Sequence, residues 1–260
     1  MKVSVIIPSL NPDEKLICVV DSLREAGFDD IILVNDGSDE NHRKPFEHAS
    51  AYPECTILTH EVNKGKGRGL KTAFEYCIKN RPDIDGVVTV DGDNQHKAAD
   101  ILKCCEKMAE CKDKVVLGVR NFSGKDVPFK SRFGNNMTSF VFKFACGLNI
   151  SDTQTGLRAI PRQYLELFDK VKGERFEYET NMLLEFKQSH IDFVEVPIET
   201  VYIEENASTH FNPIKDSLKI YGVIFKFLFS SIASSVIDLA MFALISALMF
   251  GKLDGSIRIF

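Results

Sequence analysis

The chain of 260 residues is 44% hydrophobic and 27% charged, and it carries a formal net charge of −5. This composition is typical of a globular protein and excludes collagen-like, disordered and small disulfide-stabilised chains. Nucleic-acid phosphates select basic surfaces, so no nucleic-acid partner is expected for an acidic chain. The seven cysteines are scattered and form no CxxC pair, which indicates reduced thiols of a cytosolic domain rather than a disulfide framework or a metal site.

Short apolar runs bounded by turn residues predict buried strands, and segments of helical period lie between them. The predicted strands are Val3–Pro8, Ile31–Asn35, Cys55–His60, Gly86–Asp91 and Val115–Gly118, and the predicted helices are Glu14–Ala26, Gly67–Asn80 and Ala98–Cys111. This alternation predicts an α/β fold with a mostly parallel sheet that helices cover on both faces. Ligands of such sheets bind beyond the carboxyl ends of the strands.

Two later segments are rich in apolar residues. Pro128–Gly147 combines five phenylalanines with three basic residues, which predicts either a core-packing helix or a helix lying on a membrane surface. Residues 227–250 carry one charge, Asp238, and exceed the roughly 20 apolar residues that span a bilayer, so we expect a transmembrane helix. An acid at mid-depth favours a partner helix, which leaves a homo-oligomer open.

The strongest candidate site follows the fourth predicted strand, in the stretch VTVDGDNQH. Asp91 and Asp93 are two residues apart, so strand alternation places both carboxylates on one side, and the Gly between them allows close approach of a ligand. Oxygen donors of this kind suit Mg²⁺ or Mn²⁺, which in turn neutralise a diphosphate. A solvated turn after a strand is the alternative interpretation of the same pattern.

Polar clusters also follow the first three predicted strands. They are PSLNPDE at Pro8–Glu14, NDGS at Asn35–Ser38 and NKGKGRG at Asn63–Gly69. Asp36 can accept a hydrogen bond from a nucleobase or from ribose hydroxyls, and the Gly-rich cluster lets backbone and cations approach a phosphate-bearing ligand. The Gly-rich cluster lacks the P-loop pattern GxxxxGK[ST]. Four polar clusters at four successive strand ends predict one shared site.

In this order and spacing, VIIPSLN, VNDGS, NKGKGRGLKTA and VDGDNQH resemble glycosyltransferase family 2, whose members have the Rossmann-like GT-A fold. GVRNF, DTQTGLRAIP and FEYETNML are most similar to its polyprenyl-phosphate sugar transferases, the group of dolichol-phosphate mannose synthase and bactoprenol glucosyltransferase. The tail KFLFSSIASSVIDLAMFALI resembles the first helix of a GtrA-like membrane domain. The implied organisation is a GT-A domain at 1–212, a juxtamembrane segment at 213–226 and a transmembrane helix at 227–250.

The resemblance implies roles for individual residues. Contacts to the nucleotide sugar are expected from Pro8, Leu10, Asn11, Glu14, Asp36, Lys66, Asp91 and Glu179, and ligands of a Mg²⁺ or Mn²⁺ ion from Asp91, Asp93 and Gln95. The expected catalytic residues are Asp93, Asp152, Arg120 and Arg132, of which Asp152 orients the acceptor and the two arginines bind phosphate. Related chains often carry an Arg late in the domain. This chain has His210 there, either as a replacement phosphate ligand or as a surface residue.

We therefore expect a metal-dependent inverting transferase that moves a sugar from a nucleotide-diphosphate sugar to a polyprenyl phosphate at the cytoplasmic face of the cell membrane. An ionised acceptor phosphate needs no strong general base, so positioning and charge neutralisation would supply the catalysis. A family 2 transferase acting on a glycan or lipid-headgroup hydroxyl, and a non-catalytic membrane-tethered nucleotide-sugar binder, are the alternatives. The sequence does not specify the nucleotide, although a UDP-glucose-like donor is preferred over a GDP-mannose-like one.

Overall fold

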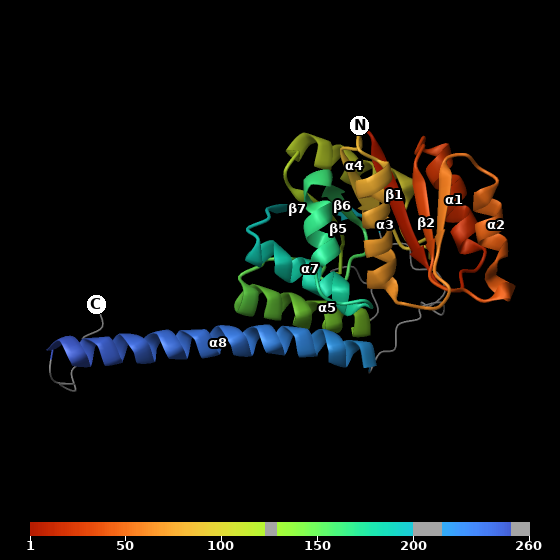
Figure 1. The fold of residues 1–260 in the computed structure, drawn as a ribbon. Helices are drawn as coiled ribbons and strands as arrows, with labels where there is room; N and C mark the ends of the chain where they lie inside the picture. The colour runs from red at the N-terminus through yellow and green to blue at the C-terminus, as the bar shows by residue number, and fades with distance from the viewer. Residues whose placement is uncertain (123–128, 200–214, 251–260) are drawn as a thin grey trace. The chain divides into compact units, whose positions relative to one another are not determined.

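The computed structural model describes residues 1–122, 129–199 and 215–250 (Figure 1). The chain divides into two compact units, Met1–Ile220 and Tyr221–Phe260. The first unit contains an α/β domain, and the second contains most of the last helix. The predicted domain boundary between residues 212 and 213 lies outside the described residues and stays a prediction.

In the described part of the chain, a seven-stranded sheet forms the centre of the first unit (Figure 1). Its strands are β1 (Val3–Ser9), β2 (Ile31–Asn35), β3 (Cys55–Thr59), β4 (Gly86–Thr89), β5 (Val115–Arg120), β6 (Arg158–Pro161) and β7 (Phe193–Ile198), in the spatial order β3-β2-β1-β4-β6-β5-β7. β1 pairs in parallel with β2 and β4, β2 with β3, and β5 with β7. β6 runs antiparallel to both neighbours, β4 and β5. The prediction of an α/β fold with a mostly parallel sheet is confirmed.

Helices flank this sheet. They are α1 (Lys15–Glu25), α2 (Lys44–Ser50), α3 (Lys66–Asn80), α4 (Ala98–Cys111), α5 (Phe129–Val141), α6 (Leu165–Lys170) and α7 (Glu177–Gln188). A further helix, α8 (Lys215–Phe250), follows in the chain and belongs largely to the second unit. Short 3-10 turns at Glu40–His42 and Arg162–Tyr164 and a π-helical turn at Phe142–Cys146 accompany them. The helices predicted between the first five strands are confirmed as α1, α3 and α4, with ends that differ by at most one residue.

The core lies on both faces of the sheet, which explains why the strands are continuous apolar runs. Residues 5–7 of β1 and 31–34 of β2 are 0% exposed, and Leu16 and Leu23 of α1 and Phe74 of α3 are equally buried. Burial of one such side chain contributes about 1.5–3 kcal/mol. The strands are thereby held rigidly, and their carboxyl ends carry the polar loops into fixed positions.

The predicted transmembrane helix over residues 227–250 is not found. The segment is helical and belongs to α8, which has 36 residues. Within the described residues, no helix is both long enough and apolar enough to cross a membrane. The expectation rested on the low number of charges in this segment, whose single charged residue is Asp238. The expected GtrA-like domain, which depended on this helix, is likewise not supported.

Candidate active site

A cavity of about 280 Å³ lies at the carboxyl ends of β1, β2 and β4. Parallel strands end at the same edge of a sheet, so the loops that follow them converge there. The structure brings together residues from all four predicted polar clusters in the cavity wall: Pro8, Leu10, Asn11, Asp36, Asn63, Lys66, Asp91 and Asp93. These loops, far apart in the sequence, therefore form one binding site.

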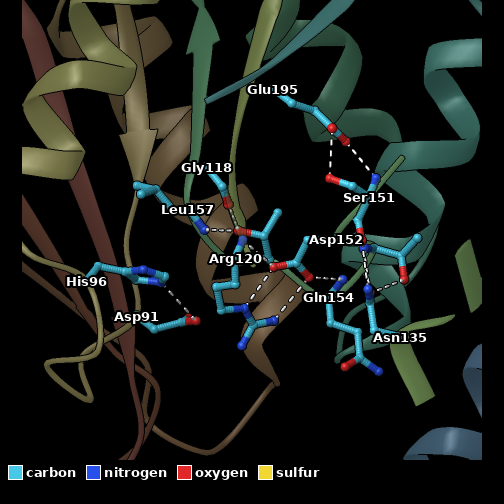
Figure 2. A network of polar contacts seen from close by, with 12 residues as sticks. Asp91, His96, Gly118, Arg120, Asn135, Ser151, Asp152, Gln154, Leu157 and Glu195 are labelled. Atoms are coloured by element: carbon cyan, nitrogen blue, oxygen red, sulfur yellow. Dashed lines mark hydrogen bonds and ion pairs between the residues drawn. The ribbon is translucent and has the colours of Figure 1, made fainter. Parts of the chain in front are cut away.

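Asp91 is the centre of a charged cluster beside the cavity. Lys66 Nζ lies 2.7 Å from Asp91 Oδ1 and 3.0 Å from Glu179 Oε2. On the other side, His96 Nε2 lies 3.9 Å from Asp91 Oδ2, as Figure 2 shows. Burial alone would raise the pKa of Asp91, but Lys66 and His96 hold it well below its usual range. Asp91 is therefore a carboxylate at neutral pH, available to a cation or to hydrogen-bond donors.

Lys66 connects the Gly-rich loop to this cluster from the first turn of α3. Burial alone would lower its pKa, but the carboxylates of Asp91 and Glu179 raise it above its usual range. The ammonium group is therefore charged at neutral pH while it is largely removed from solvent. A fixed cation that lines the cavity is suited to binding an anionic part of a ligand, such as a diphosphate.

Asp93 stands on the turn that follows Asp91. Its Oδ1 accepts a hydrogen bond from the backbone N–H of Gln95 at 3.1 Å. Burial and the neighbouring Asp91 carboxylate raise its pKa, so a cation bound between the two carboxylates would relieve their repulsion. Two carboxylates and the Gln95 amide oxygen are a donor set that suits Mg²⁺ or Mn²⁺.

The described residues contain no group of three or more His, Cys, Asp and Glu side chains arranged to hold a metal ion. Asp91 and Asp93 would supply two carboxylate ligands to a metal ion. Mg²⁺ is commonly bound in this way, through one or two carboxylates together with substrate phosphates and water. The donor set fits a cation that binds with its nucleotide better than one held permanently by the protein.

The loop before β6 approaches Asp91 from the other side. A Cβ added to Gly156 would lie 2.3 Å from Asp91 Oδ2, which is far inside van der Waals contact. Asp152 in the same loop is 0% exposed. Arg120 at the end of β5 holds it with two hydrogen bonds, Nε to Oδ2 at 2.8 Å and Nη2 to Oδ1 at 3.1 Å (Figure 2). Arg120 and Asp152 were both expected to contact the acceptor, and in the structure they bind each other.

Three elements fasten the loop that carries Asp152 (Figure 2). From α5, Asn135 Nδ2 donates to the carbonyl oxygen of Ser151 at 2.7 Å. From β7, Glu195 accepts hydrogen bonds from the backbone N–H and the hydroxyl of Ser151, both at 2.7 Å. From β5, the carbonyl oxygen of Gly118 accepts a hydrogen bond from the Thr155 hydroxyl. A loop held from α5, β5 and β7 keeps Asp152 and Gly156 in fixed positions.

The Gly-rich loop before α3 packs against the turn that precedes α7. A Cβ at Gly65, whose φ is +105°, would lie 2.4 Å from the carbonyl oxygen of Glu174. The Glu174 carboxylate accepts from Arg68 Nε at 2.5 Å and from Lys71 Nζ at 3.1 Å. Arg68 and Lys71 therefore fasten this region to the turn before α7, whereas Lys66 lines the cavity.

Two arginines at this site were not among the residues predicted from the sequence. Arg158 of β6 is 1% exposed, and its Nη1 donates to the carbonyl oxygen of Glu179 at 2.9 Å, which joins β6 to α7. Arg175 and its neighbour Phe176 line the cavity from the turn before α7. Arg158 lies within DTQTGLRAIP, and Arg175 immediately precedes FEYETNML. The resemblance of these two stretches to family 2 indicated that both regions matter, but it did not single out either arginine.

Some predicted site residues are not brought into the cavity. Its described lining includes neither Glu14 nor Gln95. Glu14 immediately precedes α1, and its carboxylate pairs with Lys44 Nζ at the start of α2, at 2.7 Å. Arg132 belongs to α5, but its side chain is outside the described part of the structure. His210 also lies outside the described residues.

A second cavity, of about 710 Å³, lies beside Arg120. The side chains of Phe140 and Lys143 line it from α5 and the π-helical turn. On the same segment Met137, Phe140 and Phe144 are 43%, 58% and 75% exposed, and the rings of the two phenylalanines lie 4.5 Å apart. This cavity therefore has the Arg120 guanidinium group and exposed aromatic side chains in its neighbourhood.

Solved structures similar to this one define the class of the fold. Mannosyl-3-phosphoglycerate synthase from Rubrobacter xylanophilus matches with a TM-score of 0.65 at 13% identity, covering 90% of this chain and 75% of that one. Glucosyl-3-phosphoglycerate synthase from Mycobacterium tuberculosis, in complex with Mn²⁺, UDP and phosphoglyceric acid, matches with a TM-score of 0.63 at 15% identity, covering 88% and 78%. At these identities the similarity shows the fold, which is of the GT-A type.

Sequence similarity shows the family. The pattern of glycosyl transferase family 2 matches residues 4–168, more than half of the chain. The protein therefore belongs to glycosyl transferase family 2 and is a glycosyltransferase.

Named relatives refine the comparison. A UDP-N-acetylglucosamine–dolichyl-phosphate N-acetylglucosaminyltransferase of Methanococcus voltae is 30% identical, with 76% of this chain and 85% of the relative covered. Glycosyltransferase AglJ of Haloferax volcanii is 26% identical over 86% of this chain and 69% of the relative. An undecaprenyl-phosphate 4-deoxy-4-formamido-L-arabinose transferase of Proteus mirabilis is 27% identical over 64% and 50%.

Proposed function

We propose that this glycosyltransferase moves a sugar from a nucleotide-diphosphate sugar to a polyprenyl phosphate, with inversion at the anomeric carbon and with Mg²⁺ or Mn²⁺. The single observation that carries the proposal is the cavity in which Asp91, Asp93 and Lys66 face a space bounded by the strand ends. It offers a cation site and a fixed ammonium group side by side, as binding of a diphosphate requires. The names of the relatives from Methanococcus voltae and Proteus mirabilis support a polyprenyl phosphate as the acceptor.

On the donor side, Asp36 would bind the nucleobase, and Pro8, Leu10 and Asn11 would line the pocket around the nucleoside. Asp91, Asp93 and Gln95 would hold the metal ion, which would supply positive charge beside the diphosphate. The ammonium group of Lys66 would move from its position between Asp91 and Glu179 to bind a phosphate oxygen of the donor. The freed Glu179 carboxylate would then accept hydrogen bonds from sugar hydroxyls.

On the acceptor side, an oxygen of the polyprenyl phosphate would form a bond to the anomeric carbon as the bond from that carbon to the diphosphate breaks. A phosphate is ionised near neutral pH, so the reaction needs no group to remove a proton. Asp152, at 0% exposure and bound by Arg120, is poorly placed to act as a base. This observation favours a phosphate acceptor over the hydroxyl of a glycan or a lipid headgroup. We assign Arg120 and Arg132 to the acceptor phosphate and Asp152 to the orientation of Arg120.

We further propose that the acceptor is met at the cytoplasmic face of the cell membrane, by the surface that Met137, Phe140 and Phe144 form. Exposed aromatic side chains beside a Lys are typical of segments that insert at the boundary between headgroups and acyl chains. Phe140 also lines the cavity that contains Arg120, so a lipid bound at this surface would present its phosphate to that arginine. We expect Phe140→Ser with Phe144→Ser to weaken flotation of the protein with anionic vesicles, and unchanged flotation would contradict this part of the proposal.

The enzymatic proposal is tested with purified protein, undecaprenyl phosphate, Mn²⁺ and radiolabelled UDP-N-acetylglucosamine, UDP-glucose or GDP-mannose. We expect a lipid-linked sugar from one of the donors, its loss on adding EDTA, and its loss in Asp93→Ala. Asp83→Ala, which removes an exposed acid on the turn before β4, is the matched control and should leave the rate unchanged. If wild type and Asp93→Ala give the same amount of product with every donor, the proposal is refuted.

A further inference from the structure

Asp36 is bound on both carboxylate oxygens at the wall of the donor cavity. The residue is 4% exposed and lines the cavity. Its Oδ1 accepts from Nδ1 of His60 at 2.7 Å and from the backbone N–H of Lys64 at 2.8 Å. Its Oδ2 accepts from the backbone N–H of Gly65 at 2.7 Å. The carboxylate is therefore fixed in orientation before any ligand binds.

Of these three donors, His60 donates from its side chain, and Lys64 and Gly65 donate from the backbone. It is 7% exposed, and its second ring nitrogen, Nε2, lies 2.9 Å from Oγ1 of Thr72 in α3. A carboxylate can only accept, so the proton of this contact must be on Nδ1 of His60, while the Thr72 hydroxyl can donate or accept. The imidazole is thus held at both nitrogens and presents a fixed N–H to Asp36.

The two backbone donors are held in place by a close contact elsewhere in the same loop. Gly37, which has a φ of +76°, lies so close that an added Cβ would be 2.4 Å from the carbonyl carbon of Val62. The segment that carries the N–H groups of Lys64 and Gly65 is therefore packed directly onto the residue after Asp36. All three donors are properties of the folded protein and do not depend on a nucleotide.

The number of donors to Asp36 determines which nucleobase the carboxylate can bind. A carboxylate has about four acceptor positions, and within the described residues three are filled, which leaves one on Oδ2. Uracil presents one ring N–H, at N3, whereas guanine presents the N–H of N1 and the amino group of N2 side by side and requires two acceptors. A base whose second donor finds no acceptor in a buried site binds more weakly by about tenfold or more.

We infer that His60 is a positioning residue for base selection: by occupying Oδ1 of Asp36, it leaves one acceptor position and so selects a uracil nucleotide over a guanine nucleotide. This inference rests on the proposed function, in which Asp36 binds the base. His60 does not line the cavity in the described structure, and it acts through Asp36. The inference therefore concerns UDP against GDP and is independent of the sugar that is transferred.

The test compares the dissociation constants of UDP and GDP in the presence of Mn²⁺, measured by calorimetry on the full chain. Wild type should bind UDP at least about tenfold more tightly than GDP. His60→Leu, which removes the donor to Oδ1, should narrow that ratio several-fold, with weaker UDP binding and stronger GDP binding. His60→Asn, whose amide N–H can take the place of Nδ1, should restore the wild-type ratio.

The control is His48→Leu, because His48 Nε2 makes a similar contact to Asp21 Oδ1, at 2.9 Å, away from the cavity. It should leave both dissociation constants unchanged. Thermal unfolding reports whether each variant folds, and His60→Phe, which also lacks a donor, replaces His60→Leu with the same expectation if the Leu variant does not fold. A wild type that binds neither nucleotide refutes the proposed function. A wild type that binds both equally, or a folded His60→Leu that keeps the wild-type ratio, overturns the role of His60 alone.

Discussion

Gly156 controls the position of Asp91, and replacing it with alanine tests whether that position matters. The added Cβ would lie 2.3 Å from Oδ2, 2.8 Å from Cγ and 2.9 Å from Oδ1 of Asp91. No left-handed backbone angle is involved at this residue, so the whole effect comes from the contact. The loop is held from several sides, by Asn135 and Glu195 among others, and cannot retreat easily. The Asp91 side chain must therefore move.

The size of the effect follows from the distance. Ordinary van der Waals contact begins at 3.4 Å, so Asp91 Oδ2 must retreat by about 1.1 Å. A displacement of this size at a reacting centre costs about a hundredfold in rate, which is about 2.7 kcal/mol of transition-state stabilisation. Because the moved carboxylate also holds Lys66, we expect weaker Mn²⁺-dependent nucleotide binding in the same variant.

The assay is lipid-linked sugar formation as a function of Mn²⁺ concentration, with urea denaturation to measure stability. Gly134→Ala is the matched control, because a Cβ at Gly134 of α5 meets no atom of the described residues within 4 Å. It should keep full activity and gain up to about 1 kcal/mol of stability from better helix propensity. If Gly156→Ala keeps the wild-type rate and Mn²⁺ dependence, Asp91 is not held in place by this contact and the reasoning is refuted.

Three further predictions concern ion pairs and thiols. Burial would raise the pKa of Glu174, but Arg68 and Lys71 lower it, so Glu174→Gln should cost up to about 1 kcal/mol in urea unfolding at pH 7. The cost should start to shrink at about pH 4.3, where Glu174 of the unfolded chain takes up its proton, and should vanish below the lower pKa of the folded protein. Arg120→Ala leaves Asp152 buried without its cation and should cost about 3 kcal/mol, and in a double-mutant cycle the variant lacking both side chains should lose less than the sum of the single variants. Burial raises the pKa of Cys104 and Cys105 to about 12, so neither should react with a thiol reagent at pH 8 until the protein is unfolded.

The first half of the fold could be predicted from the sequence because its strands are buried on both faces. Such strands need continuous apolar residues, and β1, β2 and β4 show that pattern clearly. β6 and β7 were not predicted. β6 has four residues, among them the fully buried Arg158, and its antiparallel place between β4 and β5 depends on partners distant in the sequence. Short strands of this kind are determined by tertiary contacts rather than by local pattern.

Much of the candidate site was predicted for a similar reason, because acids and glycines directly after buried strands must meet at one edge of the sheet. What could not be predicted is which charges pair. Lys66 joins Asp91 and Glu179, and Arg120 joins Asp152, through contacts that the spacing of residues does not encode. The prediction for Glu14 put it in the nucleotide pocket, because it follows the first strand closely, but the start of α1 turns it toward α2.

These pairs place Asp91 where the proposed donor and acceptor halves of the site meet. It contacts Lys66 of the Gly-rich loop on one side, and the backbone at Gly156, in the loop that carries Asp152, closes against it on the other. A shift of the Asp152 loop must therefore move a carboxylate that we assign to the metal and the diphosphate. Binding at the Arg120 side and binding at the nucleotide side are then mechanically linked, because interiors packed this closely transmit small displacements. Substitutions of Asn135, which holds that loop and lines the cavity beside Arg120, should accordingly alter nucleotide affinity as well as acceptor use.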